Sequence, residues 1–144
     1  MLISLKQYKK DYKIYIWKIY IKAMKHHIDN IWGWNLEWQK KDFKKALVRF
    51  KTEIIILNNS KVDYVQYLEL NKSIYINMII IEPDYQSRGI GPRIIGKISS
   101  INPHLPIELR CFIVNAEALN FYLKNGFKIK NKENEFYILR KATN

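Results

Sequence analysis

The first 50 residues carry two helical patterns of apolar and polar positions. One apolar face is outlined at intervals of three and four residues by Ile14, Trp17, Ile21, Met24 and Ile28. This spacing predicts an amphipathic helix that follows Asp11 and ends at about His27. Asn35 is a residue type that favours a helix N-cap, so we expect a second helix that begins there and ends at about Phe50.

Beyond residue 51 the pattern changes from helical to extended. Three β-branched and apolar stretches, 53–57, 62–70 and 74–81, are separated by short turns rich in Asn, Ser and Lys, which predicts an antiparallel meander. The rest of the chain predicts helices at 90–101 and 115–124 and strands at 107–114, 127–130 and 136–139, and residues 2–7 predict a first strand. The fold class is therefore α/β (α+β), with about seven strands and about four helices.

Length and composition indicate one domain spanning residues 1–144. No apolar run of about 18 residues occurs, and the N-terminus lacks the features of a signal peptide, so we expect a cytoplasmic protein without a membrane partner. Cys111 is the single cysteine and lies in an apolar run, which predicts a buried residue without a catalytic role. No metal site is expected.

The positive charge is concentrated in the first third of the chain. The net charge is +12, and residues 1–51 hold 13 Lys and Arg against 4 Asp and Glu. Such a surface is typical of proteins that bind nucleic acid or phosphorylated substrates. The lysines are scattered, however, and the composition is rich in Lys, Ile and Asn throughout, so a solvated helix face explains them as well.

A glycine turn joins the strand at 74–81 to the helix at 90–101. Gly89 and Gly91 lie where backbone N–H groups and the helix N-terminus could bind a phosphate. A tight turn needs glycine for steric reasons too, so this spacing alone does not decide between the two roles. No Gly-Lys-Ser/Thr follows and the preceding strands are linked as hairpins, which disfavours both a P-loop and a dinucleotide fold.

Two segments resemble the motifs of the GNAT superfamily of N-acetyltransferases. Residues 79–91 read Ile-Ile-Ile-Glu-Pro-Asp-Tyr-Gln-Ser-Arg-Gly-Ile-Gly, which is similar to the family's Gln/Arg-x-x-Gly-x-Gly/Ala motif behind a strand. The family's Asn-x-x-Ala-x-x-Phe-Tyr-x-x-x-Gly-Phe motif is matched by Asn115, Ala118, Phe121, Tyr122, Gly126 and Phe127. The order of predicted elements also resembles that of the family along the whole chain.

The resemblance implies a mixed, mostly antiparallel sheet that splays between its fourth and fifth strands, with acetyl-CoA bound in the gap. The implied cofactor contacts are Ile79, Ile80 and Ile81 on the strand, Gln86, Ser87, Arg88, Gly89, Ile90 and Gly91 in the turn, and Asn115 and Tyr122 in the second motif. Pro92 departs from many relatives and has no N–H to offer, although proline suits a first helical turn.

The family places the motif tyrosine beside the CoA sulfur, which implies that Tyr122 is the general acid. Its phenol has an ordinary pKa of about 10, near that of an alkyl thiol. Members that acetylate ribosomal-protein N-termini use a Glu five residues before the motif Asn, but Arg110 occupies that position here. Glu69 is the remaining candidate base, either directly or through water, although a strand Glu that simply faces solvent is the commoner case.

The acceptor side is expected at the joint between the first two helices. Trp32, Trp34, Asn35 and Gln39 resemble the Trp-Gly-Trp-Asp/Asn-x-x-x-Gln segment of one uncharacterised GNAT subgroup. They are candidate substrate-binding residues, although tryptophans that only pack a helix joint explain the segment equally well.

The leading hypothesis is an acetyl-CoA-dependent N-acetyltransferase that acts on a primary amine of a small molecule or peptide by direct attack in a ternary complex. A toxin-like acetylase of aminoacyl-tRNA is the alternative enzyme, suggested by the basic first third. A catalytically idle CoA-binding or nucleic-acid-binding module is the alternative from another class. A nucleic-acid partner is not favoured, and we expect a monomer or a homodimer.

Overall fold

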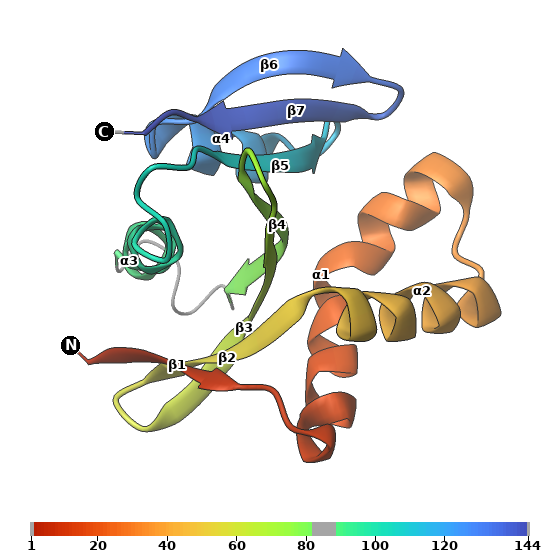
Figure 1. The fold of residues 1–144 in the computed structure, drawn as a ribbon. Helices are drawn as coiled ribbons and strands as arrows, with labels where there is room; N and C mark the ends of the chain where they lie inside the picture. The colour runs from red at the N-terminus through yellow and green to blue at the C-terminus, as the bar shows by residue number, and fades with distance from the viewer. Residues whose placement is uncertain (1, 82–88, 144) are drawn as a thin grey trace.

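The strands and helices of the protein (Figure 1) follow one another in the order that the sequence predicts. The computed structural model describes residues 2–81 and 89–143. Within these ranges the strands are β1 (Ile3–Gln7), β2 (Lys51–Leu57), β3 (Ser60–Glu69), β4 (Ile74–Ile81), β5 (Ile107–Phe112), β6 (Lys128–Glu133) and β7 (Phe136–Lys141). The helices are a 3-10 turn, η1 (Lys10–Tyr12), and α1 (Lys13–Trp32), α2 (Leu36–Arg49), α3 (Ile90–Ser99) and α4 (Ala116–Lys124).

The seven strands of the described chain form one mixed sheet in the order β1-β2-β3-β4-β5-β7-β6. The predicted meander is confirmed, because β2 pairs antiparallel with β3 and β3 pairs antiparallel with β4. Among the described strands, the parallel pair is β4 with β5, and the helix α3 makes the crossover between them. The predicted α+β class, with a mixed, mostly antiparallel sheet of about seven strands and about four helices, is therefore confirmed.

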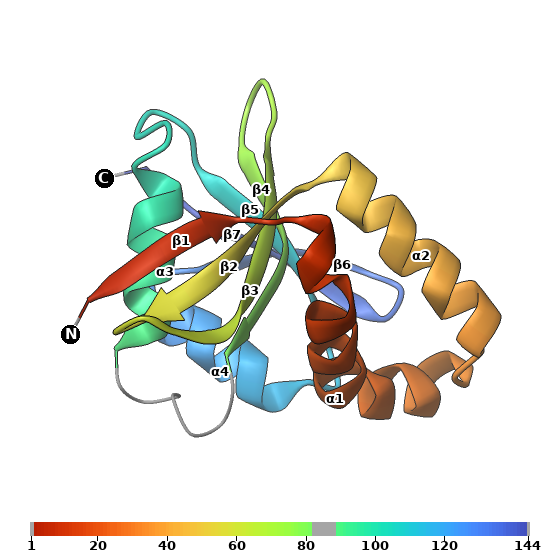
Figure 2. The same ribbon diagram turned by 90° about the horizontal axis from the view of Figure 1, so that it is seen from below.

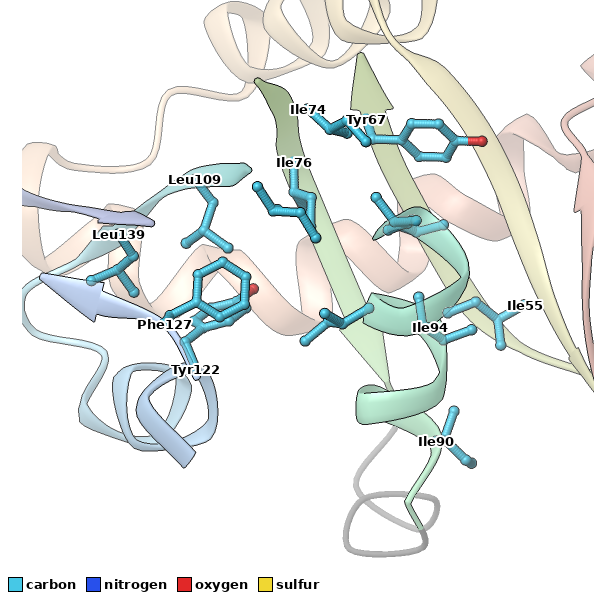
Figure 3. Packing of buried hydrophobic residues seen from close by; sticks show 14 of the residues in the cluster. Ile55, Tyr67, Ile74, Ile76, Ile90, Ile94, Leu109, Tyr122, Phe127 and Leu139 are labelled. Carbon is cyan, nitrogen blue, oxygen red and sulfur yellow. The ribbon is translucent and has the colours of Figure 1, made fainter. Parts of the chain in front are cut away.

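The two faces of the sheet carry separate apolar clusters. Figures 1 and 2 show α3 and α4 on one side of the sheet and α1 and α2 on the other. The first cluster joins Ile94 and Ile98 of α3 and Tyr122 of α4 to the sheet, and Figure 3 shows part of it. The second joins Ile16 of α1 and Phe43 of α2 to the opposite face. We call these the α3/α4 face and the α1/α2 face.

The first helix differs from its prediction in length and in orientation. It continues to Trp32 instead of ending near His27, and it ends where Gly33 adopts a φ of 82°. Ile14 of the predicted apolar face is 69% exposed, while Ile16, Ile19 and Tyr20 are buried. Apolar residues surround much of this helix, so their spacing fits more than one face, and packing against the sheet and α2 selects one of them.

The second helix begins as predicted. The Asn35 side chain accepts a hydrogen bond from the backbone N–H of Trp38 at 2.9 Å, which satisfies one of the donors that a helix start leaves unpaired. Phe43, in the middle of α2, is 5% exposed and fixes the helix against the sheet.

Candidate active site

The fourth and fifth strands diverge after a short region of pairing. Three ladder pairs join them, Ile74 with Ile107, Tyr75 with Glu108 and Ile76 with Leu109. Within the described residues no further pair forms between these strands, although β4 continues to Ile81 and stays paired with β3 on its other side. The edge of β4 that faces β5 can therefore hydrogen-bond an extended ligand as an added strand would. Ile79, Ile80 and Ile81 lie in this diverging part.

A β-bulge lies where the divergence begins. Gln66 pairs with Met78 and Tyr67 with Ile76, which leaves Asn77 as the additional residue on β4. The Asn77 Nδ2 donates to Gln66 Oε1 at 2.9 Å, and Gln66 Nε2 donates to Thr52 Oγ1 at 3.1 Å. This chain of side-chain hydrogen bonds crosses β4, β3 and β2 and stabilises the bend. This hydrogen-bonded chain was not predicted from the sequence. The feature that could have indicated it is an amide side chain, Gln66 or Asn77, in the middle of each of two apolar strands.

Two glycines shape the start of α3 for different reasons. Gly89 is the N-cap residue and has a φ of 76°, a left-handed conformation that side chains rarely adopt. At Gly91 a Cβ atom would collide with the ring of Phe121 on α4. Ile90 lies between them and is 1% exposed, so it anchors the turn in the core. The backbone N–H groups of the first helical turn have no intrahelical partners and are suited to an anion.

The diverging strands and the glycine-capped start of α3 lie where the resemblance implies a CoA site. The diverging edge of β4 leads directly towards the start of α3, as Figure 3 shows for the α3/α4 face. The predicted contacts Gln86, Ser87 and Arg88 lie outside the described residues.

The second motif builds α4 and buries Tyr122. Asn115 is the N-cap of α4, and its side chain accepts a hydrogen bond from the Ala118 N–H at 3.1 Å. Tyr122 is 9% exposed, and its ring lies edge-on to Phe121 and Phe127 with centroids 5.2 and 5.3 Å apart. Burial raises the pKa of the Tyr122 hydroxyl well above its ordinary value, and Cys111 adds to this effect. Tyr122 is therefore a neutral hydrogen-bond donor at physiological pH.

Cys111 lies on the diverging part of β5, on the same face as Tyr122. It is 5% exposed, and burial raises the pKa of its thiol to about 11. A protonated thiol is a poor nucleophile. The prediction of a buried cysteine is confirmed.

The two tryptophans beside Gly33 face different parts of the molecule. Trp32 is 57% exposed, and its ring lies 5.6 Å from Phe112 on β5 and 6.0 Å from Phe136 on β7. Trp34 is half-buried and contacts Trp17 and Tyr20 of α1, with centroids 6.4 and 6.2 Å apart. The rings of Trp32 and Trp34 therefore do not form one continuous substrate-binding surface.

The two polar residues of the same segment have partners within the helical pair. Asn35 caps α2, and Gln39 is 3% exposed and accepts a hydrogen bond from the Tyr20 hydroxyl at 2.9 Å. Burial raises the pKa of Tyr20, so that hydroxyl stays protonated and keeps donating. The hydrogen bond between Tyr20 and Gln39 holds α2 against α1, whereas the Asn35 contact stays within the first turn of α2.

Glu69 lies at the other end of the diverging strand. It pairs with Ile74, is exposed and accepts a hydrogen bond from Asn102 Nδ2 at 3.3 Å. Ile79 is five residues further along β4, which corresponds to about 17 Å at about 3.3 Å per residue. The structure thus does not bring Glu69 to the part of β4 that diverges from β5.

The described residues contain no group of three or more His, Cys, Asp and Glu side chains that could hold a metal ion. In the same part of the chain, none of the helices is both long and apolar enough to span a membrane.

Comparisons with known proteins agree with this geometry. Residues 51–129 match the family model described as an acetyltransferase (GNAT) domain. The PaiA N-acetyltransferase of Thermoplasma acidophilum, solved with coenzyme A, superposes with a TM-score of 0.76 at 16% identity over 99% of each chain. A GNAT-family acetyltransferase of Staphylococcus aureus Mu50 has the same TM-score and identity over 99% of this chain and 100% of its own.

A putative streptothricin acetyltransferase of Bacillus anthracis, solved with acetyl coenzyme A, is 20% identical with a TM-score of 0.57 over 66% of this chain and 64% of its own. Comparison with curated protein sequences gives no match. At these identities the solved structures establish the shared fold, and the family model covers more than half of the chain. The protein therefore belongs to the GNAT family of acetyltransferases, whose acyl donor is acetyl-CoA.

Proposed function

We propose that this protein is an N-acetyltransferase that transfers the acetyl group of acetyl-CoA directly to a primary amine. The observation that carries the proposal is the divergence of β4 from β5 next to the glycine-capped start of α3. The edge of β4 at Ile79–Ile81 would hydrogen-bond the amides of the pantetheine arm. The first-turn N–H groups after Gly89 would bind the pyrophosphate, together with the predicted contacts Gln86, Ser87 and Arg88.

Bound acetyl-CoA supplies a thioester carbonyl carbon, which the amine nitrogen attacks, so that a C–N bond forms and the C–S bond breaks. Tyr122 is the proposed donor to the leaving sulfur, and water then restores its proton. Burial raises the pKa of the Tyr122 hydroxyl, so it stays protonated and can donate a hydrogen bond to the sulfur as negative charge develops there. Asn115 supports Tyr122 by fixing the start of α4.

The proton of the attacking amine must also leave. Glu69 lies too far along the sheet for direct transfer, so we propose that water accepts this proton. Glu69→Gln separates the alternatives: if Glu69 is the base, the substitution lowers kcat and removes the acidic limb of the pH–rate profile. If water accepts the proton, we expect kcat within about twofold of the parent enzyme and an unchanged profile.

The acceptor would enter from the α1/α2 face beside the exposed ring of Trp32. Phe112 and Phe136 stack with centroids 4.7 Å apart and continue the apolar surface that Trp32 begins. Trp34, Asn35 and Gln39 would act on the acceptor indirectly, because their contacts fix the geometry of the helical pair that presents Trp32.

Two measurements test the proposed function. Thermal melts with acetyl-CoA report binding to the native state, since such a ligand raises the melting temperature by mass action. Release of free CoA in the presence of amines and peptides reports transfer. A melting temperature that saturating acetyl-CoA leaves unchanged would contradict the proposal, and stabilisation without turnover on any acceptor would identify a CoA-binding module without catalytic activity.

Acetylation of an aminoacyl-tRNA is the second candidate function. It is favoured by the exposed lysines of α2, which are Lys40, Lys41, Lys44 and Lys45. Contacts to phosphates weaken steeply with salt, so tRNA binding that falls by orders of magnitude between low and moderate salt supports this candidate. Binding that is weak at all salt concentrations supports a small-molecule acceptor.

A further inference from the structure

Arg110 occupies the point at which the two central strands separate. Leu109 is the last residue of β5 that pairs with β4, and Arg110 follows it directly. Ile107, Leu109 and Cys111 belong to the cluster on the α3/α4 face. Because side chains alternate along a strand, Glu108 and Arg110 lie on the opposite face, the one on which an acceptor would bind.

Two arginine guanidinium groups near this point pack on aromatic rings. The Arg110 guanidinium lies 3.9 Å from the centroid of the Phe136 ring, and Arg49 at the end of α2 lies 5.3 Å from that of Phe50. Phe50 stacks on Tyr75, with centroids 6.1 Å apart. Burial raises the pKa of the Tyr75 hydroxyl, whereas the positive charges of Arg110 and Arg49 both act to lower it. Both arginines therefore lie close enough to Tyr75 to affect its ionisation.

These two cations lack a neutralising acid in the described part of the chain. Neither Arg49 nor Arg110 has a carboxylate oxygen within 4.0 Å there. Glu108 lies on the same face of β5, but its Oε2 pairs with Lys130 Nζ at 2.8 Å. Arg110 and Arg49 are both exposed, so an anion can reach them from solvent. A guanidinium held flat on an aromatic ring still presents its N–H groups at its edge, where a carboxylate or phosphate binds in a bidentate manner.

We infer that the acceptor amine carries an anionic group, which Arg110 binds at the point where β4 and β5 separate, with Arg49 adding positive charge. This inference rests on the proposed acetyl transfer and narrows its substrate class. Binding the anion at a fixed point beside the diverging strands orients the amine towards the thioester and so lowers the entropic cost of the reaction. The aromatic surface of Phe112 and Phe136 would hold the apolar part of the same acceptor.

Matched acceptors test the requirement for an anion. Rates of CoA release are compared for phenylalanine against phenylalaninamide, and for O-phosphoethanolamine against ethanolamine. We expect kcat/KM to be about tenfold higher for the anionic member of at least one pair, and the pair that responds distinguishes a carboxylate from a phosphate. The amine of phenylalaninamide is the less basic one, so a preference for phenylalanine cannot arise from amine protonation.

Substitutions assign the preference to a residue. Arg110→Gln should bring the anionic-to-neutral ratio of kcat/KM from about tenfold to near one, and Arg110→Lys should retain part of it, because a lysine keeps the charge but not the bidentate geometry. Lys97→Gln removes one exposed charge from α3, on the other face of the sheet, and should leave the ratio unchanged. The acetyl-CoA-induced rise in melting temperature verifies that each variant folds.

The possible failures are distinguishable. CoA release with no preference for the anionic acceptors, or a preference that Arg110→Gln leaves intact, overturns the inference and leaves the proposed transfer standing. An equal loss of preference in Lys97→Gln also overturns it, since net charge would then be the cause. No CoA release from any acceptor in a broad amine panel overturns the proposed function and the inference with it.

Discussion

The proposed donor side and the proposed acceptor side of this protein differ in how their residues are held in place. On the proposed donor side, Gly89 and Gly91 lie in one short motif at the start of α3, and Tyr122 lies in a second short motif in α4. On the acceptor side, Trp32 contacts strands that follow it by about 80 residues or more in the sequence. A cofactor common to a whole family imposes a local motif, whereas an acceptor surface is assembled from distant segments.

This difference means that substitutions on the donor side should abolish function without unfolding the protein. Gly89→Asp is expected to have the largest effect, because it places a carboxylate where a phosphate would bind, and it should abolish the acetyl-CoA-induced rise in melting temperature. Gly89→Asn is the matched control, since it places a side chain of the same size on the same left-handed residue without the negative charge. If both variants keep the response to acetyl-CoA, the start of α3 is not the phosphate site.

Tyr122→Phe tests the donor side at the chemical step. We expect kcat to fall by about 10²-fold with little change in the Kd of acetyl-CoA, because the ring packing is retained and a proton donor is lost. Tyr137→Phe, on the same face of the sheet, serves as the control. An unchanged kcat would show that water protonates the sulfur.

The pH–rate profiles of the parent enzyme and of Tyr122→Phe test the role of Tyr122 further. Burial raises the pKa of Tyr122 above its ordinary value of about 10, so ionisation of this group should not lower kcat at any pH below that value. A loss of activity near neutral pH that disappears in Tyr122→Phe would contradict the assignment.

On the acceptor side, substitutions of Trp34 and Trp32 should have different effects on stability and on the acceptor KM. Trp34→Ala removes a half-buried ring from the helical pair and should lower the free energy of unfolding by about 2 kcal/mol. Trp32→Ala removes an exposed ring and should change stability less but raise the acceptor KM several-fold. Urea denaturation and steady-state kinetics measure the two quantities. Equal effects on stability would contradict the division between a packing and a binding tryptophan.

Gln39→Ala should have the smallest effect on catalysis and a definite effect on stability. The substitution leaves the Tyr20 hydroxyl without its partner, which should cost about 1–2 kcal/mol. Tyr20→Phe combined with Gln39→Leu removes both polar groups and should recover part of that loss, as urea denaturation can show. If Gln39→Ala instead keeps its stability and raises the acceptor KM, Gln39 contacts the acceptor directly.

Local sequence was sufficient for much of the donor side. The glycine turn before α3 and the helix that follows Asn115 were predictable, because the residues that signal each of them lie a few positions apart. The Asn35 cap of α2 was predictable for the same reason. The apolar face of α1 was not, because isoleucines and aromatic residues surround that helix, and the choice of Ile16 over Ile14 is made by the sheet and α2.

Sequence alone therefore determined the order of elements, the α+β class, the two GNAT motifs and the Asn35 cap, because each depends on backbone preferences and on contacts between residues close in the chain. Only the tertiary structure decided where β4 leaves β5, that Asn77 bonds to Gln66 at that point, and that Arg110 lies beside Phe136 there. It also decided that Gln39 is buried against Tyr20. These features arise from strand register and from contacts between residues far apart in the chain, which no local pattern encodes.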